Sequence, residues 1–236
     1  MRGTTAEKRA TGRHGGARTI ERKSHEAPHR FHRSPRHGRH RLRHRRPGQP
    51  GQRRPKERSL VKVLTSDGNH FDKNRNDFDI VTEAALAVVK AKPESPVALL
   101  ADGSVKLTAF IPNDEAFRLL AQDLTGKRLK SEKRIFNTLV KVAGVDTIEQ
   151  VLLYHVVPGV KINSKAALKA NNAVLTTAQG GTFKVKVRGG KKPQIKLLDR
   201  DPNNRNPRVI LSKVDINKGN KQIAHGIDRV LRPIDL

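Results

Sequence analysis

Two histidines are of a residue type that could support catalysis, and each lies in an apolar segment. His155 follows Tyr154 in one such run, and His225 stands in another near the C-terminus. Either imidazole could pair in space with Asp215 or Asp228, but no serine stands on a recognisable sharp turn. The sequence also has no Gly-x-Ser-x-Gly, Walker or Gly-x-Gly-x-x-Gly motif. We therefore predict that both histidines are hydrogen-bonded structural groups, that Tyr154 and His155 are largely buried, and that the protein is not an enzyme.

Two oxygen-rich stretches have the composition of calcium loops. The first runs from Asp72 to Glu83, which is the spacing of such a loop, but Asp77 stands where the loop requires glycine. The second, at 199–203, has no bidentate glutamate at its end. Turn and helix-capping chemistry explains both stretches more simply, so we predict neither a metal site nor a cofactor.

A group of basic residues follows the alternation of a half-buried strand. Apolar Phe183 and Val185 alternate with cations, and the next apolar alternation surrounds another lysine after a Gly-Gly turn. The candidate basic patch comprises Lys184, Lys186, Arg188, Lys191, Lys192 and Lys196. Like charges opposed across a ladder are mildly destabilising, so the patch either serves an anionic partner or is a solvated face that discourages aggregation. The scarcity of aromatic residues argues against single-stranded nucleic acid.

The elements that position these residues change in character along the chain. The first half reads as helical, with expected helices over 79–91, 114–120, 132–142, a short one opened by Thr147, and one capped by Ser164 that ends at 170. A single buried strand is expected there, at 105–111, followed by Asn113 as a helix cap. Later strands are expected at 183–187, 195–197, 209–211 and 223–231. This segregation predicts an α+β fold.

Residues 1–58 form a low-complexity tail of Arg, His, Pro and Gly. It holds 16 Arg and 3 Lys against 4 Glu and almost no large apolar residue, so we predict a disordered tail followed by one domain over 59–236. Three interpretations of the tail stay open: an arm that binds nucleic acid or another polyanion, a metal-binding histidine tract, or a segment foreign to the natural mature protein. GC-rich DNA read in the wrong frame, or from too early a start, gives such mixtures.

Composition excludes several classes of site. The chain has no cysteine, which excludes disulfides, thiolate metal sites and thiol catalysis. No apolar run reaches the length of a membrane span, and the basic N-terminus lacks the apolar core of a signal peptide.

Three segments resemble the motifs of the fasciclin domain family. The first is matched by Thr108, Phe110, Pro112, Asn113, Asp114, Ala116 and Phe117. The second is the Tyr-His motif, matched by 153–159 with Tyr154, His155 and Pro158. The third is matched by Ile227, Asp228, Val230, Leu231 and Pro233, with His225 just before it. The resemblance covers about 60–236.

This resemblance implies a wedge-shaped fold with a β-sandwich core and helices covering one side. It also implies a secreted or cell-surface module for adhesion and matrix binding, without catalysis, in which the motif residues are mainly structural. An Asp-Ile pair before the last block contacts receptors in adhesive relatives, and Asp215-Ile216 stands at the matching place. A strand-end Asp that caps a turn is the alternative explanation of that pair.

Three functional hypotheses follow. The first is an interaction module that binds an anionic wall or matrix polymer, or a surface protein, through the basic strand face. The second is a carrier of a small hydrophobic ligand, which relatives in the family suggest and which requires an apolar cavity lined by residues such as Phe117, Leu120 and Leu139. The third is nucleic-acid binding through the tail.

Overall fold

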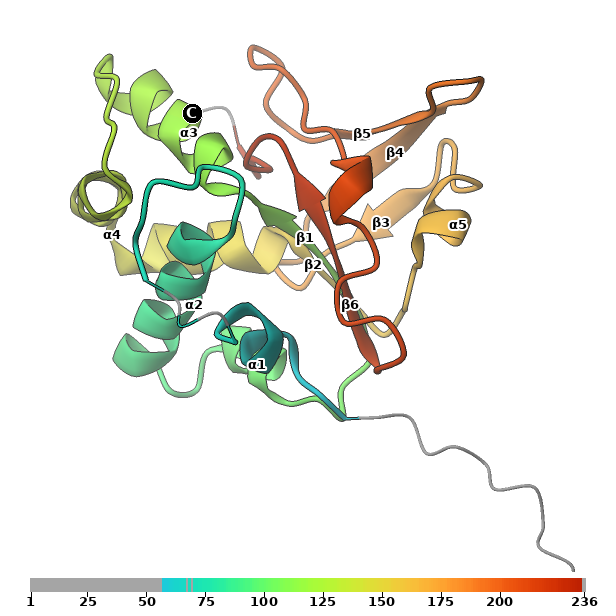
Figure 1. Ribbon diagram of the computed structural model, residues 1–236, viewed down its shortest axis with the longest axis horizontal. Coiled ribbons are helices and arrows are strands. Elements are labelled where there is room, and N and C mark those ends of the chain that lie inside the picture. Colours follow the sequence, from blue (N-terminus) through green and yellow to red (C-terminus); the bar gives the residue numbers. More distant parts are fainter. Residues whose placement is uncertain (1–56, 67, 69, 235–236) are drawn as a thin grey trace, which may run out of the picture. The chain divides into compact units, whose positions relative to one another are not determined.

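The helices are set by the apolar spacing and by the capping residues that precede them. The computed structural model describes residues 57–66, 68 and 70–234 (Figure 1). Its helices are α1 (Leu60–Leu64), α2 (Asp79–Ala91), α3 (Asp114–Thr125), α4 (Glu132–Tyr154) and α5 (Ser164–Ala167), with 3₁₀ turns η1 (Pro96–Ala101) and η2 (Leu211–Lys213). The described residues belong to a unit delimited as Gln52–Leu236. Nearly all of the tail predicted to be disordered lies outside them, and the boundary at 59 stays a prediction.

The structure confirms one of the helix caps predicted from the sequence and contradicts another. Asn113 Oδ1 accepts from Ala116 N at 3.0 Å, which confirms the predicted cap of α3. The prediction of Ser164 as the cap of α5 is wrong, because the cap is Asn163, whose Oδ1 accepts from Ala166 N at 2.9 Å. That helix also ends at Ala167 rather than at 170.

The two helices expected over 132–142 and after Thr147 are joined in α4. The joint is Gly144, whose φ of +75° and ψ of 165° interrupt the helical backbone. Such a left-handed φ is accessible to glycine without the steric cost that a side chain would bring. Residues of both halves of α4, such as Ile135 and Leu152, lie in one core cluster with residues of α2 and α3.

Within residues 57–234, as far as they are described, six strands form two sheets of three. The first sheet has the order β2 (Val156–Pro158), β1 (Leu107–Pro112), β6 (Gln222–Ile227), with β1 antiparallel to β2 and parallel to β6. Every residue of β1 and β6 is buried, as expected of strands covered on both faces. The second sheet is antiparallel with the order β3 (Val174–Thr176), β4 (Thr182–Arg188), β5 (Gln194–Leu198).

The first sheet lies between the helices and the second sheet (Figure 1). On one face Phe110 meets Phe183 of β4 with their rings edge-to-face and 5.4 Å between centroids. On the other face Leu107, Ala109 and Ile111 pack towards α1 and the helical layer. The predicted α+β architecture, with a β-sandwich core and helices on one side, is confirmed.

Two expected strands differ from the structure. The strand expected at 209–211 is reduced to isolated bridges, in which Arg208 pairs with Lys196 and Val209 with Ile227. The strand expected at 223–231 ends at Ile227, and the following Asp228 accepts a hydrogen bond from Arg208 N at 2.7 Å. In the described part of the chain, no helix is long and apolar enough to cross a membrane.

Candidate functional site

Tyr154 and His155 connect the end of α4 to two distant parts of the chain. Tyr154 is 0% exposed and its hydroxyl donates to Thr182 O at 2.7 Å. His155 Nδ1 lies 2.7 Å from Val151 O, and its Nε2 accepts from Leu231 N at 2.9 Å. Because a carbonyl only accepts, the imidazole is neutral with its proton on Nδ1. Burial lowers the pKa of His155 to about 4. The predicted burial and hydrogen bonding of both side chains are confirmed.

His225 is held in the same way on β6. Its Nε2 lies 2.8 Å from Ile162 O, and its Nδ1 accepts from Asp215 N at 3.4 Å. Burial lowers its pKa as well. Its ring lies 5.7 Å from that of Phe110. Within the described residues, no serine hydroxyl forms a hydrogen bond with either imidazole. The possible pairs of these histidines with Asp215 or Asp228 are therefore not part of a Ser-His arrangement.

Asp215 is tied to the segment that opens α5. Its two carboxylate oxygens accept from Ser164 N at 2.7 Å and from Ser164 Oγ at 2.8 Å. Burial alone would raise the pKa of Asp215, but the two hydrogen bonds from Ser164 outweigh burial, so the pKa of this carboxyl is lowered. Ile216 is partly buried and pairs with Ala224. Both carboxylate oxygens are thus engaged within the fold, and a receptor contact by this Asp-Ile pair stays a prediction.

The remaining motif residues join strands to loops. Thr108 Oγ1 donates to Val160 O at 3.0 Å and accepts from Ile162 N at 2.8 Å. Pro112 closes β1, and Pro158 closes β2 opposite Leu107. These contacts hold the first sheet together.

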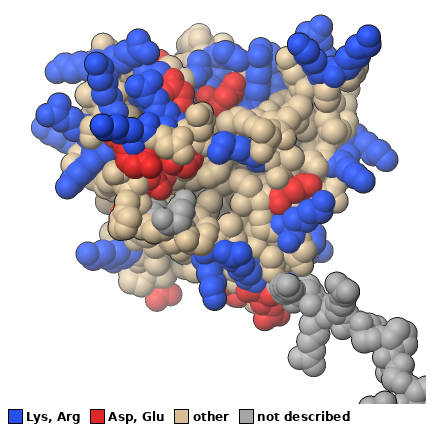
Figure 2. Space-filling view, in the orientation of Figure 1, with Lys and Arg blue, Asp and Glu red and all other residues tan. Residues whose placement is uncertain are grey.

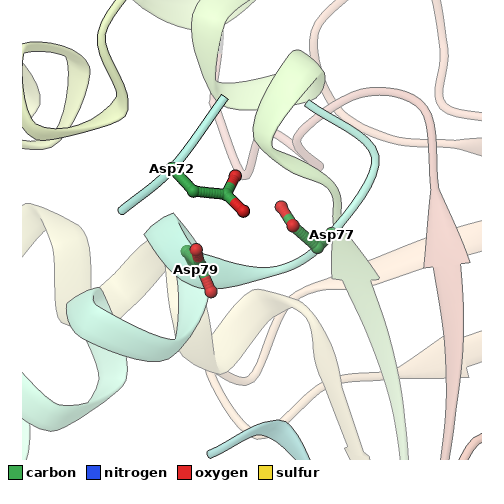
Figure 3. A group of neighbouring side chains, drawn as sticks. All are labelled: Asp72, Asp77 and Asp79. Carbon is green, nitrogen blue, oxygen red and sulfur yellow. The ribbon is translucent and has the colours of Figure 1, made fainter. Parts of the chain in front are cut away.

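Five carboxylates gather where α2, α3 and α4 begin. Figure 3 shows Asp72 and Asp77 pointing toward one another beside Asp79. Oxygens of these three lie within 4.8 Å of one another, as do those of Asp77, Asp114 and Glu132, which is close enough for either group to hold a cation. Asp114 caps α2 by accepting from Ile80 N at 2.8 Å.

Capping thus explains part of this acidic cluster. Burial and a hydrogen bond with Asp77 raise the pKa of Asp114 to about 9, and burial raises that of Glu132 to about 7. The twelve-residue calcium loop is not formed, because Glu83 lies within α2.

The second oxygen-rich stretch is organised by an arginine. Asp201 Oδ2 pairs with Arg232 Nη1 at 2.9 Å, and its Oδ1 accepts from Asn203 N and Asn204 N. Arg232 Nη2 also pairs with Asp123 at 2.5 Å. Turn chemistry and a buried guanidinium therefore account for this loop.

The candidate basic patch forms on β4, β5 and the turn between them, as predicted, and Arg208 adds one residue to it. We call this surface the basic strand face. Lys186 of β4 lies directly opposite Lys196 of β5. The backbone of Lys196 forms an isolated antiparallel β-bridge with that of Arg208. Lys184, Lys186, Arg188, Lys191 and Lys192 are exposed and Lys196 is half-buried. None of these six forms an ion pair with any described carboxylate. Arg208 was missed in the sequence, because its segment lacks strand alternation and joins the sheet through one bridge.

An apolar cavity of about 270 Å³ lies between α2, α3 and α4. Its walls include Phe117, Leu120 and Leu139, the residues named from the sequence for a carrier cavity. Thr147, beside the Gly144 kink, is the one polar side chain among its described lining residues.

One comparison with known proteins, the match to a family model, agrees with the motifs. No curated protein matches the chain. A similar solved structure is the FAS1 domain pair from the insect cell adhesion molecule fasciclin I, with 20% identity, a TM-score of 0.43, and coverage of 63% of this chain and 44% of that chain. The chain therefore spans less than half the length of that domain pair. The fasciclin domain model matches residues 82–233, and because this is more than half of the chain, the protein belongs to the fasciclin domain family, whose members are adhesion-type modules that are typically extracellular or surface-associated.

Proposed function

We propose that this domain is a non-enzymatic, extracellular or surface-associated interaction module that binds an anionic wall or matrix polymer through its basic strand face. The observation that carries this proposal is the row formed by Lys186, Lys196 and Arg208 across three neighbouring backbone segments. Directly opposed residues of a sheet have Cβ atoms about 5 Å apart, so unpaired cations in such a row repel one another. A linear polyanion laid across the strands would relieve that repulsion and release its counterions.

The test is polyanion binding over a salt series. We expect replacement of Lys184, Lys186, Lys191 and Lys196 by Gln to weaken binding to heparin and to flatten the dependence of log K on log salt. The slope should change by about one for each contacting cation removed. A matched control removes the same charge from exposed lysines elsewhere, namely Lys62, Lys90, Lys165 and Lys218. Equal slopes for the strand-face variant and this control would contradict the proposal.

A second candidate function is transport of a small hydrophobic ligand, favoured by the apolar cavity between α2, α3 and α4. Its volume of about 270 Å³ lies just below the range of about 300–1,000 Å³ that holds drug-sized ligands. It suits a small apolar molecule or one end of a longer one.

A neutral fluorescent probe distinguishes a binding cavity from a packing defect. We expect N-phenyl-1-naphthylamine to bind the wild-type protein with a saturable rise in fluorescence. Ala143→Leu, at a half-buried lining position, should fill part of the cavity and weaken that binding with little change in the far-UV circular dichroism. Unchanged affinity in this variant would exclude the cavity as the site.

A further inference from the structure

A second group of cations lies on the helical side of the domain. It covers the connection between α3 and α4 and the first half of α4, and we call it the helix surface. It consists of Lys127, Arg128, Lys130, Lys133, Arg134 and Lys141, all of which are exposed. The strand face and the helix surface thus carry similar numbers of cations on different elements.

The spacing on α4 places these cations on one side of the helix. Lys133, Arg134 and Lys141 fall within about a third of a turn of one another at 100° per residue. Ile135 and Leu139, on the other side, are buried among α2 and α3. The cations of α4 therefore point away from the core.

The negative charge near the helix surface comes from other segments, because Arg128 lies close enough to Glu115 of α3 to help lower the pKa of that carboxyl and the acidic cluster lies where α4 begins. Glu132 is the one acidic residue between 127 and 143, but it is 3% exposed and its Oε2 accepts from Asp72 N at 2.6 Å, so it is turned inward. Other basic side chains of the domain are paired, such as Lys92 with Asp146 and Glu149. No cation of the helix surface forms an ion pair within the described part of the chain.

The two basic surfaces lie over different parts of the domain. Figures 1 and 2 place one over α3 and α4 and the other over β4 and β5, with the sheet of β1, β2 and β6 between them. A helical layer and the spacing of two packed sheets together amount to on the order of 20 Å. The Debye length at physiological ionic strength is about 8 Å, so a polyanion bound to one surface is screened from the other.

We infer that the helix surface is a second binding site for an acidic polysaccharide, so that a single domain can hold two polysaccharide segments and bridge them. This inference rests on the proposed function of the strand face and adds a site to it. The chemistry favours polysaccharide over single-stranded nucleic acid, because no aromatic side chain among the described residues is exposed to stack on bases. Charge alone is sufficient for binding a sulfated or carboxylated sugar chain.

Lysine footprinting on the full-length protein tests the two sites separately. The probe is a heparin tetrasaccharide, which is too short to span both surfaces, and exposed amines are acetylated with and without it before mass spectrometry. We expect slower acetylation at Lys130, Lys133 and Lys141 of the helix surface as well as at Lys186 of the strand face. Lys62 and Lys218, which are exposed outside both surfaces, serve as internal controls.

A variant distinguishes failure of this inference from failure of the proposed function. In the strand-face variant with four Lys→Gln changes, protection of the helix surface should persist at the same tetrasaccharide concentration. Protection of the strand face without any protection of the helix surface would overturn the second site and leave the proposed function standing. Protection at neither surface would overturn both. Protection of the helix surface that disappears in the strand-face variant would show one continuous site and would also overturn the inference.

Discussion

The buried His155 should make the stability of this domain depend on pH. The ordinary imidazole pKa of 6.5 describes the unfolded chain, whereas burial lowers the pKa in the folded protein to about 4. Between these values the unfolded state binds a proton that the folded state does not. The stabilising contribution is therefore complete above pH 6.5 and is lost as pH falls towards 4.

The size of this contribution follows from the difference between the two pKa values. At about 1.4 kcal/mol for each pH unit, the free energy of unfolding should fall by about 3 kcal/mol between neutral pH and pH 4 because of this residue alone. Protonation would also place a donor on Nε2, where Leu231 N already donates at 2.9 Å. The fall in the free energy of unfolding at low pH thus has an identified structural cause.

His155→Gln isolates the effect, since other groups titrate in both proteins. We expect the variant to be less stable than wild type at pH 7.5, and the difference to shrink by about 3 kcal/mol as the pH falls to 4. Urea denaturation followed by far-UV circular dichroism suits a chain without tryptophan. Tyr154→Phe is the control, because it removes a neighbouring buried bond without a group that titrates in this range. A wild-type-to-Gln difference that stays constant from pH 7.5 to 4 would refute the assignment of His155 as a buried, neutral imidazole.

Three further changes test other parts of the fold. Tyr154→Phe removes the hydroxyl that donates to Thr182 O, and should lower the free energy of unfolding by about 1–3 kcal/mol in urea melts. Asp114→Asn removes a carboxyl whose pKa is raised to about 9, so wild type should lose stability relative to the variant as the pH rises from 4 to 9; a pH-independent difference would contradict this. Asn163→Ala should lower the free energy of unfolding by about 1 kcal/mol through loss of the α5 cap, while Ser164→Ala should instead disturb the contact with Asp215. An unchanged free energy of unfolding in both variants would contradict the observed cap.

The parts of this fold that were predictable from the sequence are those encoded locally. The helix at 79–91, the strand that ends at Pro112 and the Asn113 cap each carry their signals within a few residues. The two short strands β2 and β3 lacked such signals, because three residues show no periodicity and their pairing depends on distant partners.

The error at α5 has the same origin. Asn163 and Ser164 are both good capping residues, and the choice between them is made by Asp215, which binds Ser164 from a distant part of the chain. Similarly, the lysines of β4 were evident from alternation, whereas Arg208 joins their row only through the sheet. The second basic surface on α4 could have been found from its helical spacing and its single acidic residue.

The parallel pairing of β1 with β6 has a consequence for how the chain is made. Leu107 lies opposite Gln222, so the central strand obtains this neighbour only after about 115 further residues have been synthesised. Loop closure over such a distance is slow, and β1 has an apolar face on each side while it waits. Until β6 has been synthesised, the nascent chain therefore has an open sheet edge at β1. A chain that lacks the last few residues of β6 should not reach the native state and should instead be bound by chaperones or degraded by proteases.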